Sequence, residues 1–274
     1  MKKITTIFYF LFFVFCFLQL NAQEQIIINY PRFRIGLEVG VDAFFGKINK
    51  PEMIRENQSY YYDEDIFFFS GFVDNYKTHN FLYLGIKPEY TLSKRFAVSV
   101  GVRFVYNKLK LNADQDCFLW KISETETKTD YVRIKNITQN NYYIGIPLQI
   151  KFFPNEKDYF VRHYFVFGTA LNFLIASPIS VTFKDKKMDV YASQVLNQIG
   201  KPSIFQGYLY GGIGLKIGNS KYPFGVIEFH LNYMYGKNNE KALANNKNKF
   251  GLGVQTTLQI PTARKHQFTY PIND

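Results

Sequence analysis

Glu228, His230 and Asn232 alternate with apolar residues near the C-terminal end of the chain. At a spacing of two residues they share one face of a β-strand, and a carboxylate beside an imidazole is a pair that can transfer a proton. Hydrolytic chemistry also needs a nucleophile, and Asn232 has none. Neither a Gly-x-Ser-x-Gly nor a His-Glu-x-x-His pattern occurs, and the other three histidines are too isolated in sequence to form a metal site. The sequence therefore predicts no enzyme, no cofactor and no metal.

The kind of strand that would position these side chains is clearest in residues 142–153, YYIGIPLQIKFF. Every even-numbered position in this segment is apolar or aromatic. Gly145, Gln149 and Lys151 lie on the opposite face. An unbroken apolar face opposite a polar one is typical of a strand in a transmembrane β-barrel, with lipid outside and a polar lumen inside.

Seven further segments show the same alternation. The eight predicted barrel strands cover residues 32–45, 81–92, 95–107, 142–153, 162–175, 205–217, 224–235 and about 250–259. No outward position in their central parts carries a charge, which at mid-bilayer would cost about 2–4 kcal/mol. Aromatic residues gather near the strand ends, as interfacial girdles do. The predicted girdle residues are Tyr106, Tyr142, Phe173 and Tyr235 on one side and Phe96, Phe152, Phe165 and Phe224 on the other.

The connections between these strands are alternately long and short. Outer-membrane barrels have this asymmetry, with long extracellular loops and short periplasmic turns. The long connections cover residues 46–79, 108–139, 176–204 and 236–248. The predicted fold class is therefore an all-β, transmembrane, antiparallel up-and-down barrel of eight strands with both termini in the periplasm. A ten-stranded barrel with an extra hairpin in residues 60–74 is the alternative, although Asp63-Glu64-Asp65 interrupts its lipid face.

Charged residues recur on the inward face of the predicted strands. The predicted lumen network comprises Arg34, Glu38, Asp42, Lys87, Glu89, Arg103, Lys151, Lys216, Glu228, His230 and Asn232. Five positive and four negative groups nearly balance. An eight-stranded barrel is just wide enough for its own side chains, so we expect these groups to pair and fill the lumen. A narrow proton or ion path and a lipid-modifying enzyme remain alternatives.

Residues 143–152, YIGIPLQIKF, resemble the fourth strand of the PorT-like outer-membrane β-barrel family. That strand characteristically has an Ile-Pro-Leu core followed by apolar residues, a lysine and an aromatic residue. The resemblance implies an eight-stranded OmpA-like barrel, and some relatives take part in protein secretion and gliding machinery. The long first and third loops and the tail after the last strand depart from the family pattern.

The N-terminal residues have the layout of a secretory signal peptide. A basic start is followed by an apolar run and by a small residue, Ala22, suited to cleavage. We expect residues 1–22 to be removed, leaving a barrel domain of residues 23–274 with strands within about 32–260 and a short tail, 261–274. Cys117 is then the only cysteine, which excludes an intramolecular disulfide.

The composition constrains the partners. The formal charge is +11, and it falls to +9 when the two lysines of the signal peptide are removed. No nucleic-acid motif occurs, so the expected partners are outer-membrane lipid and anionic lipopolysaccharide, with a further envelope or secretion protein as a possible third.

The first long loop contains the predicted interaction surface. Its aromatic residues are Tyr60, Tyr61, Tyr62, Phe67, Phe68 and Phe69. Exposed aromatic residues in this number are costly in water unless they pack on a neighbouring loop or bind a partner. The predicted function is a structural or interaction protein of the outer membrane whose loops bind an envelope component. The packing alternative is contact with Phe118, Leu119 and Trp120 of the second loop.

Overall fold

The computed structural model describes residues 32–46, 51–56, 58–63, 77–124, 129–157, 159–218, 222–235, 243 and 250–262. The predicted signal peptide and all but two residues of the predicted tail lie outside these ranges, as do Phe67, Phe68 and Phe69. No helix in the described ranges is long and apolar enough to cross a membrane.

Eight antiparallel strands form a closed ring, so the predicted barrel is confirmed. The ring closes through β1 and β13, which pair from Arg34 opposite Pro261 to Phe44 opposite Gly251. In chain order the barrel strands are β1 (Phe33–Gly46), β3 with β4 (Lys77–Ile86, Glu89–Thr91), β5 with β6 (Phe96–Val100, Val102–Ala113), β8 (Thr129–Phe152), β9 (Val161–Ala176), β11 (Phe205–Ile217), β12 (Phe224–Tyr235) and β13 (Phe250–Pro261). Each pairs with its neighbours in chain order, which is the up-and-down topology.

Two barrel strands are interrupted. One breaks between β3 and β4 at Pro88, and the other breaks between β5 and β6 at Gly101, which lies beside Pro147 of β8. Pro88 has no backbone donor, and it separates β3 from β4. The neighbouring strand keeps the pairing: the Val100 amide donates to the Pro88 carbonyl at 3.2 Å, and the Gly101 amide donates to the Pro147 carbonyl at 3.1 Å. A Cβ at Gly101 would lie 2.3 Å from the Ile86 carbonyl oxygen, so only glycine fits between the two strands here.

The outward face of the ring is apolar, as the alternation predicts. Leu84, Phe167 and Leu231 are each more than 60 % exposed, and the charged residues of the same strands are buried inside. One girdle assignment was wrong. Phe224 has the parity of Glu228 and points into the lumen, where it is 5 % exposed.

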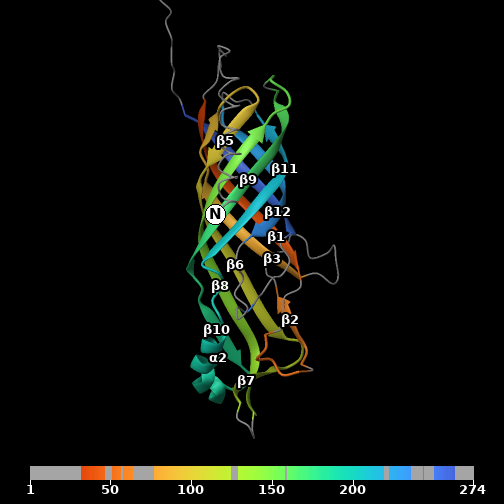
Figure 1. Ribbon diagram of the computed structural model, residues 1–274, viewed down its shortest axis with the longest axis vertical. Helices are drawn as coiled ribbons and strands as arrows, with labels where there is room; N and C mark the ends of the chain where they lie inside the picture. The colour runs from red at the N-terminus through yellow and green to blue at the C-terminus, as the bar shows by residue number, and fades with distance from the viewer. Residues whose placement is uncertain are drawn as a thin grey trace, which may run out of the picture.

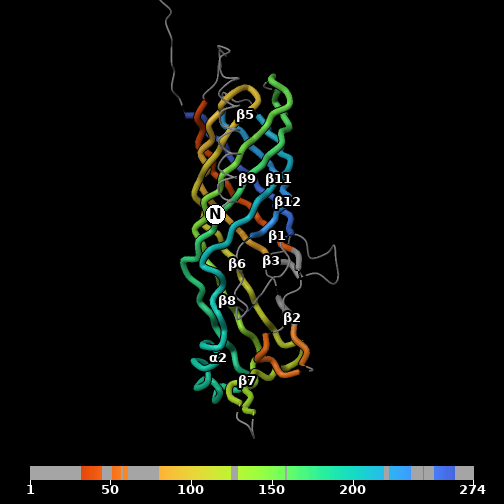
Figure 2. The backbone as a smooth tube through the Cα atoms, viewed as in Figure 1, coloured from red at the N-terminus to blue at the C-terminus, as the bar shows by residue number. Residues whose placement is uncertain are grey.

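The two ends of the barrel differ. At one end, here called the hairpin end, the short connections lie together with the start of β1 and the end of β13. At the other end a separate lobe extends beyond the ring (Figure 1). The tube in Figure 2 shows the same arrangement, with β2, β7 and α2 grouped at the lower end, away from the barrel strands β5 and β9.

The lobe consists of elements that the sequence pattern assigned to irregular loops. β6 and β8 continue past the barrel and pair with each other up to Asn112 and Asn136. Added to them are β2 (Tyr60–Asp63) beside β6, β7 (Phe118–Glu124) and β10 (Ile179–Phe183) beside β8, the 3₁₀ helix η1 (Lys186–Tyr191) and the helix α2 (Ala192–Gln198). The second and third predicted long connections, 108–139 and 176–204, are therefore largely regular structure. The sequence prediction ended the strand before Lys108, because Lys108 and Lys110 put charge on its outward face. Outside a bilayer, however, a strand can carry charge on that face.

The lobe has its own hydrophobic core. Trp120, Phe118, Leu111 and Ile137 are fully buried in it, and the Trp120 indole donates to the Gln198 side-chain oxygen of α2 at 2.7 Å. Its surface carries ion pairs. Lys184 donates to Asp116, and this hydrogen bond lowers the pKa of the Asp116 carboxyl.

The described residues contain an eight-stranded ring and not a ten-stranded one. β2 pairs only with the extension of β6, with Tyr60 opposite Ala113 and Asp63 opposite Lys110, so it is part of the lobe. The rest of the candidate extra hairpin lies outside the described ranges.

Candidate functional site: the closed lumen

The structure places the whole predicted lumen network inside the barrel. None of its eleven residues is more than 4 % exposed. From the hairpin end toward the lobe, their contacts form three successive layers that come from all parts of the ring.

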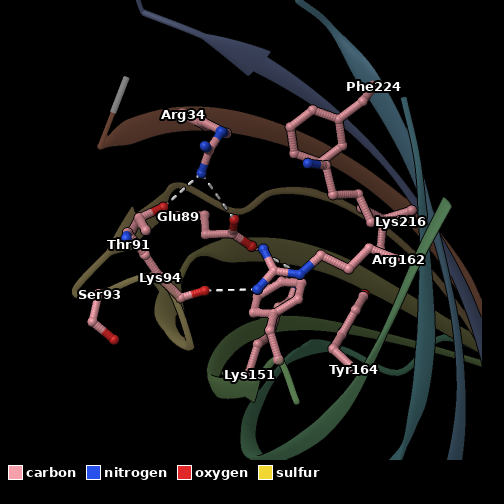
Figure 3. Close-up of a pocket in the computed structure, with 12 residues that line it drawn as sticks. Arg34, Glu89, Thr91, Ser93, Lys94, Lys151, Arg162, Tyr164, Lys216 and Phe224 are labelled. Carbon is pink, nitrogen blue, oxygen red and sulfur yellow. Dashed lines mark hydrogen bonds and ion pairs between the residues drawn. The ribbon is translucent and has the colours of Figure 1, made fainter. Parts of the chain in front are cut away.

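The first layer lies at the hairpin end (Figure 3). The Arg34 guanidinium contacts the Glu89 carboxylate at 3.4 Å and donates to the Thr91 hydroxyl at 2.7 Å. The Lys151 ammonium is 2.8 Å from the other oxygen of Glu89. The Lys216 ammonium lies 4.8 Å from the centre of the Phe224 ring.

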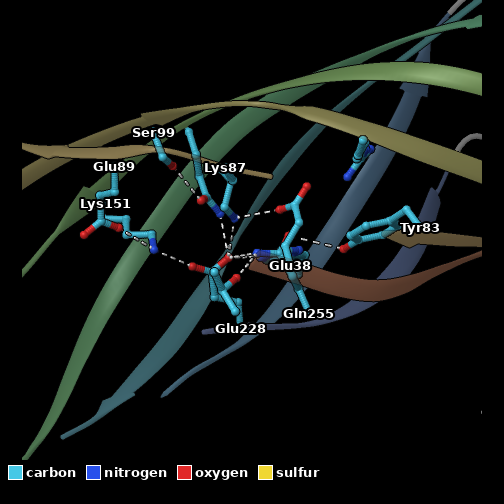
Figure 4. Close-up of polar contacts among 12 residues, drawn as sticks. Glu38, Tyr83, Lys87, Glu89, Ser99, Lys151, Glu228 and Gln255 are labelled. Carbon is cyan, nitrogen blue, oxygen red and sulfur yellow. Dashed lines mark hydrogen bonds and ion pairs between the residues drawn. The ribbon is translucent and has the colours of Figure 1, made fainter. Parts of the chain in front are cut away.

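The central layer is organised around Glu228 (Figure 4). Its carboxylate is 2.9 Å from the Lys151 ammonium and 3.8 Å from the Lys87 ammonium, and Lys87 is in turn 3.1 Å from Glu38. Neutral donors complete its surroundings: the Tyr164 hydroxyl at 2.6 Å, the Gln149 amide at 2.6 Å and the Gln255 amide at 3.0 Å. Glu228 therefore links β12 to β8, β9 and β13, and to Lys87 between β3 and β4, in a single buried cluster.

The third layer joins Asp42 to the aromatic side chains on the lobe side of the lumen. Asp42 accepts hydrogen bonds from the Tyr208 hydroxyl and, at 2.7 Å, from the Asn232 amide. The Arg103 guanidinium donates to the Tyr208 hydroxyl and lies 4.2 Å from the centre of the Tyr83 ring. Beyond this layer, Phe44, Phe81 and Tyr143 pack edge to face or tilted across the lumen. The barrel interior is thus filled by side chains.

Glycines make the room for the lumen tyrosines. Gly40 is directly opposite Tyr83, and Gly214 is directly opposite Tyr164. A Cβ at Gly40 would lie 2.4 Å from the Tyr83 hydroxyl oxygen, and one at Gly214 would lie 2.2 Å from the Tyr164 ring. Each ring therefore lies flat across the glycine of its neighbouring strand, the aromatic–glycine pairing that helps to fix strand register.

Several network members are absent from the predicted set. Gln149, Gln255 and Tyr164 all contact Glu228, and Arg162, 5 % exposed, donates to the backbone carbonyls of Lys94 and Asn155. All four have inward parity, so the alternation could have identified them. The predicted set was limited to charged residues and the segment of residues 228–232, so it omitted the three neutral donors. It also omitted Arg162, although Arg162 is charged.

Within the described ranges, His230 contacts a carboxylate and an aromatic ring. Its Nε2 is 3.2 Å from the Glu228 carboxylate, and its ring packs on Tyr210 with 4.8 Å between centroids. Asn232, which follows it on the same face, contacts Asp42 instead. Among the described residues, no group of three or more His, Cys, Asp or Glu side chains could hold a metal ion.

The predicted interaction surface is only partly described. Tyr60 packs against the core of the lobe, a cluster that includes Phe118 and Trp120. Tyr61 and Tyr62 lie in β2, which pairs with β6.

No protein-family model matches the chain, and no curated protein matches it. Two similar solved structures are outer-membrane proteins of Pseudomonas aeruginosa. The outer membrane protein OprG is 8 % identical, over 85 % of this chain and 97 % of its own, with a TM-score of 0.44. The N-terminal β-barrel domain of OprF is 11 % identical, over 81 % of this chain and 97 % of its own, with a TM-score of 0.29. The fold assignment rests on the strand pairing itself.

Proposed function

We propose that this chain is a β-barrel protein of a Gram-negative outer membrane, with a closed lumen and an extracellular lobe that binds another envelope component. The observation that carries the proposal is the contrast between the two faces of the ring. The outward face is apolar and exposed, whereas the charged side chains of the same strands are buried in the lumen. If water surrounded the outside of the ring, charged side chains would be favoured on the outward face and apolar side chains in the interior.

The height of the apolar face fits a bilayer. On β8 the outward residues from Tyr142 to Phe152 carry no charge. Ten residues of strand extend about 33 Å, which a tilt of about 40° reduces to about 25 Å across the membrane. This is the height of the apolar band of outer-membrane barrels. The hairpin end then lies in the periplasm and the lobe outside the cell.

The packed lumen favours an interaction protein over a channel or an enzyme. The three layers of contacts fill the interior, and the Glu228 carboxylate is held by ion pairs and hydrogen bonds from several strands. The lobe, with its own buried core, is a folded platform outside the membrane. Residues such as Val190, 76 % exposed on η1, are available there for a partner. The PorT-like resemblance of β8 supports a secretion-machinery protein as that partner.

The location is tested by moving one charge along the same sheet. Leu148→Arg places a guanidinium in the middle of the apolar face, at a cost of about 2–4 kcal/mol. Ser180→Arg places the same group on exposed β10 of the lobe, on the sheet formed with β8. We expect Leu148→Arg to abolish the heat-modifiable folded form in outer-membrane fractions and Ser180→Arg to retain it. Equal amounts of folded protein from the two variants would contradict membrane insertion.

The partner is tested by photocrosslinking in whole cells. A crosslinking amino acid at Val190 should capture a defined envelope component, because this position is exposed on the lobe. The matched control is Tyr222, 67 % exposed at the hairpin end. The same product from both positions, or none from Val190, would argue against binding by the lobe.

A further inference from the structure

The hairpin end of the lumen contains a small pocket with a pronounced excess of positive charge (Figure 3). Its charged lining consists of Arg34, Lys94, Lys151, Arg162 and Lys216, with Glu89 as the one carboxylate among the lining residues described. Arg34, Lys151, Arg162 and Lys216 are each at most 5 % exposed, whereas Lys94 is exposed at the rim.

The buried cations of the lining have partners within the barrel. Glu89 is shared between Arg34 and Lys151, and Lys151 also contacts Glu228 in the next layer. The positive charge of the lining therefore exceeds that of these two carboxylates. Aromatic rings hold the cations in place: Arg162 lies 4.2 Å from the centre of the Phe153 ring, and both Arg34 and Lys216 lie over Phe224.

We propose that this hairpin-end pocket binds a small oxyanion, of the class of inorganic phosphate or the terminal phosphate group of a soluble metabolite. Guanidinium and ammonium groups that converge on one point from different strands are the donors that such an anion prefers. The space between the side chains, about 20 Å³, holds about one water molecule and is partly open to solvent. One phosphate oxygen can therefore replace a water there while the rest of the group faces the opening, and an extended ligand is excluded.

The anion does not need an unpaired cation. An ammonium has three donors and a guanidinium has five, so each can keep its present partner and still donate to a further oxygen. Arg162, for instance, donates to the carbonyls of Lys94 and Asn155 and so ties the pocket to two short hairpins. Anion binding should therefore stiffen the hairpin end as a unit. The inference goes beyond the proposed function and holds wherever the barrel is located.

The test is anion binding by the full-length barrel refolded in zwitterionic micelles. Isothermal titration at constant ionic strength measures the Kd for inorganic phosphate, for glycerol 3-phosphate and for chloride. We expect phosphate to bind and chloride not to compete at equal concentration. Glycerol 3-phosphate should bind with equal or greater affinity if the natural ligand carries a terminal phosphate, and more weakly if it is free phosphate.

Variants assign the binding to the pocket. Lys216→Gln should weaken phosphate binding about tenfold or more, since it removes a charged hydrogen-bond donor, and Lys216→Arg should restore it. Lys94→Gln should weaken it less, because Lys94 is at the rim; this exposed substitution also carries the test if Lys216→Gln does not fold. Lys186→Gln, the same change on an exposed residue of the lobe, is the matched control. The proposal fails if phosphate does not bind, or if Lys216→Gln and Lys94→Gln bind it as the unaltered protein and Lys186→Gln do.

Discussion

At the scale of single residues, Glu228 is the side chain on which the lumen depends most. It is fully buried, and it contacts two lysines, Lys151 at 2.9 Å and Lys87 at 3.8 Å. A buried charge cluster gives little net stability compared with an apolar core, but removing one member leaves its partners uncompensated. The cluster is thus most sensitive to the loss of a single charge.

Glu228→Gln should therefore destabilise the barrel by about 3–5 kcal/mol, because Lys87 and Lys151 lose a shared counter-charge in a closed interior. Urea unfolding of the barrel refolded in micelles measures the change. The matched control is Glu124→Gln, which breaks the exposed pair with Lys121 and should leave the unfolding midpoint almost unchanged. If the two variants unfold at the same urea concentration, the Glu228 cluster does not hold the barrel strands together.

The alternation of the sequence predicts on which side of the sheet a residue lies, but not which residues it meets. Arg34, Glu38 and Lys87 were all assigned to the lumen, and they lie there. That Lys87 meets Glu38 and Glu228 follows from the stagger between barrel strands, which no single strand encodes. Phe224 was misplaced because an aromatic residue at a strand end fits a membrane girdle and a lumen layer equally well.

At the scale of elements, the exclusion of charge by lipid explains why some strand bounds were predicted correctly and others were not. Inside the apolar band lipid excludes charge from one face, so the bounds of β11 and β12 were predicted to the residue. Outside the band that constraint ends. The extensions of β6 and β8 carry Lys108, Lys110 and Arg133 on a solvent face and were assigned to loops, although their inner face remains apolar through Leu109, Leu111 and Ile134.

The lobe should consequently be a unit that can be destabilised or unfolded while the barrel stays folded. Trp120→Ala removes a fully buried indole and its hydrogen bond to Gln198, a change that typically costs about 3–5 kcal/mol. We expect rapid proteolysis within the lobe while the heat-modifiable barrel persists on gels. Val190→Ala, at an exposed position, should leave both unchanged. Loss of the folded barrel in Trp120→Ala would show instead that the lobe is needed for barrel folding.

At the scale of the whole molecule, function depends on whether the ring encloses a path. All eight barrel strands contribute side chains to the three layers of the lumen network. The aromatic layer of Phe44, Phe81 and Tyr143 closes the lumen at the lobe end. The small pocket at the hairpin end leads only as far as Lys151, where the Glu228 cluster begins. A ring of this size closed by its own side chains agrees with the proposal that the barrel anchors the lobe in the membrane.

Planar bilayers that contain the purified barrel should therefore show no stable conductance at moderate voltage. Ions would have to displace Lys87, Lys151 and Glu228 from contacts that fill the interior, and an ion held between them would meet charge of both signs. A general porin reconstituted in the same way verifies that the assay detects open channels. Rare, small openings would reflect transient rearrangement of the Glu228 cluster, and Glu228→Gln should then make them more frequent. A steady porin-like current through the unaltered protein would contradict the closed lumen, and with it the conclusion that the barrel acts through its lobe.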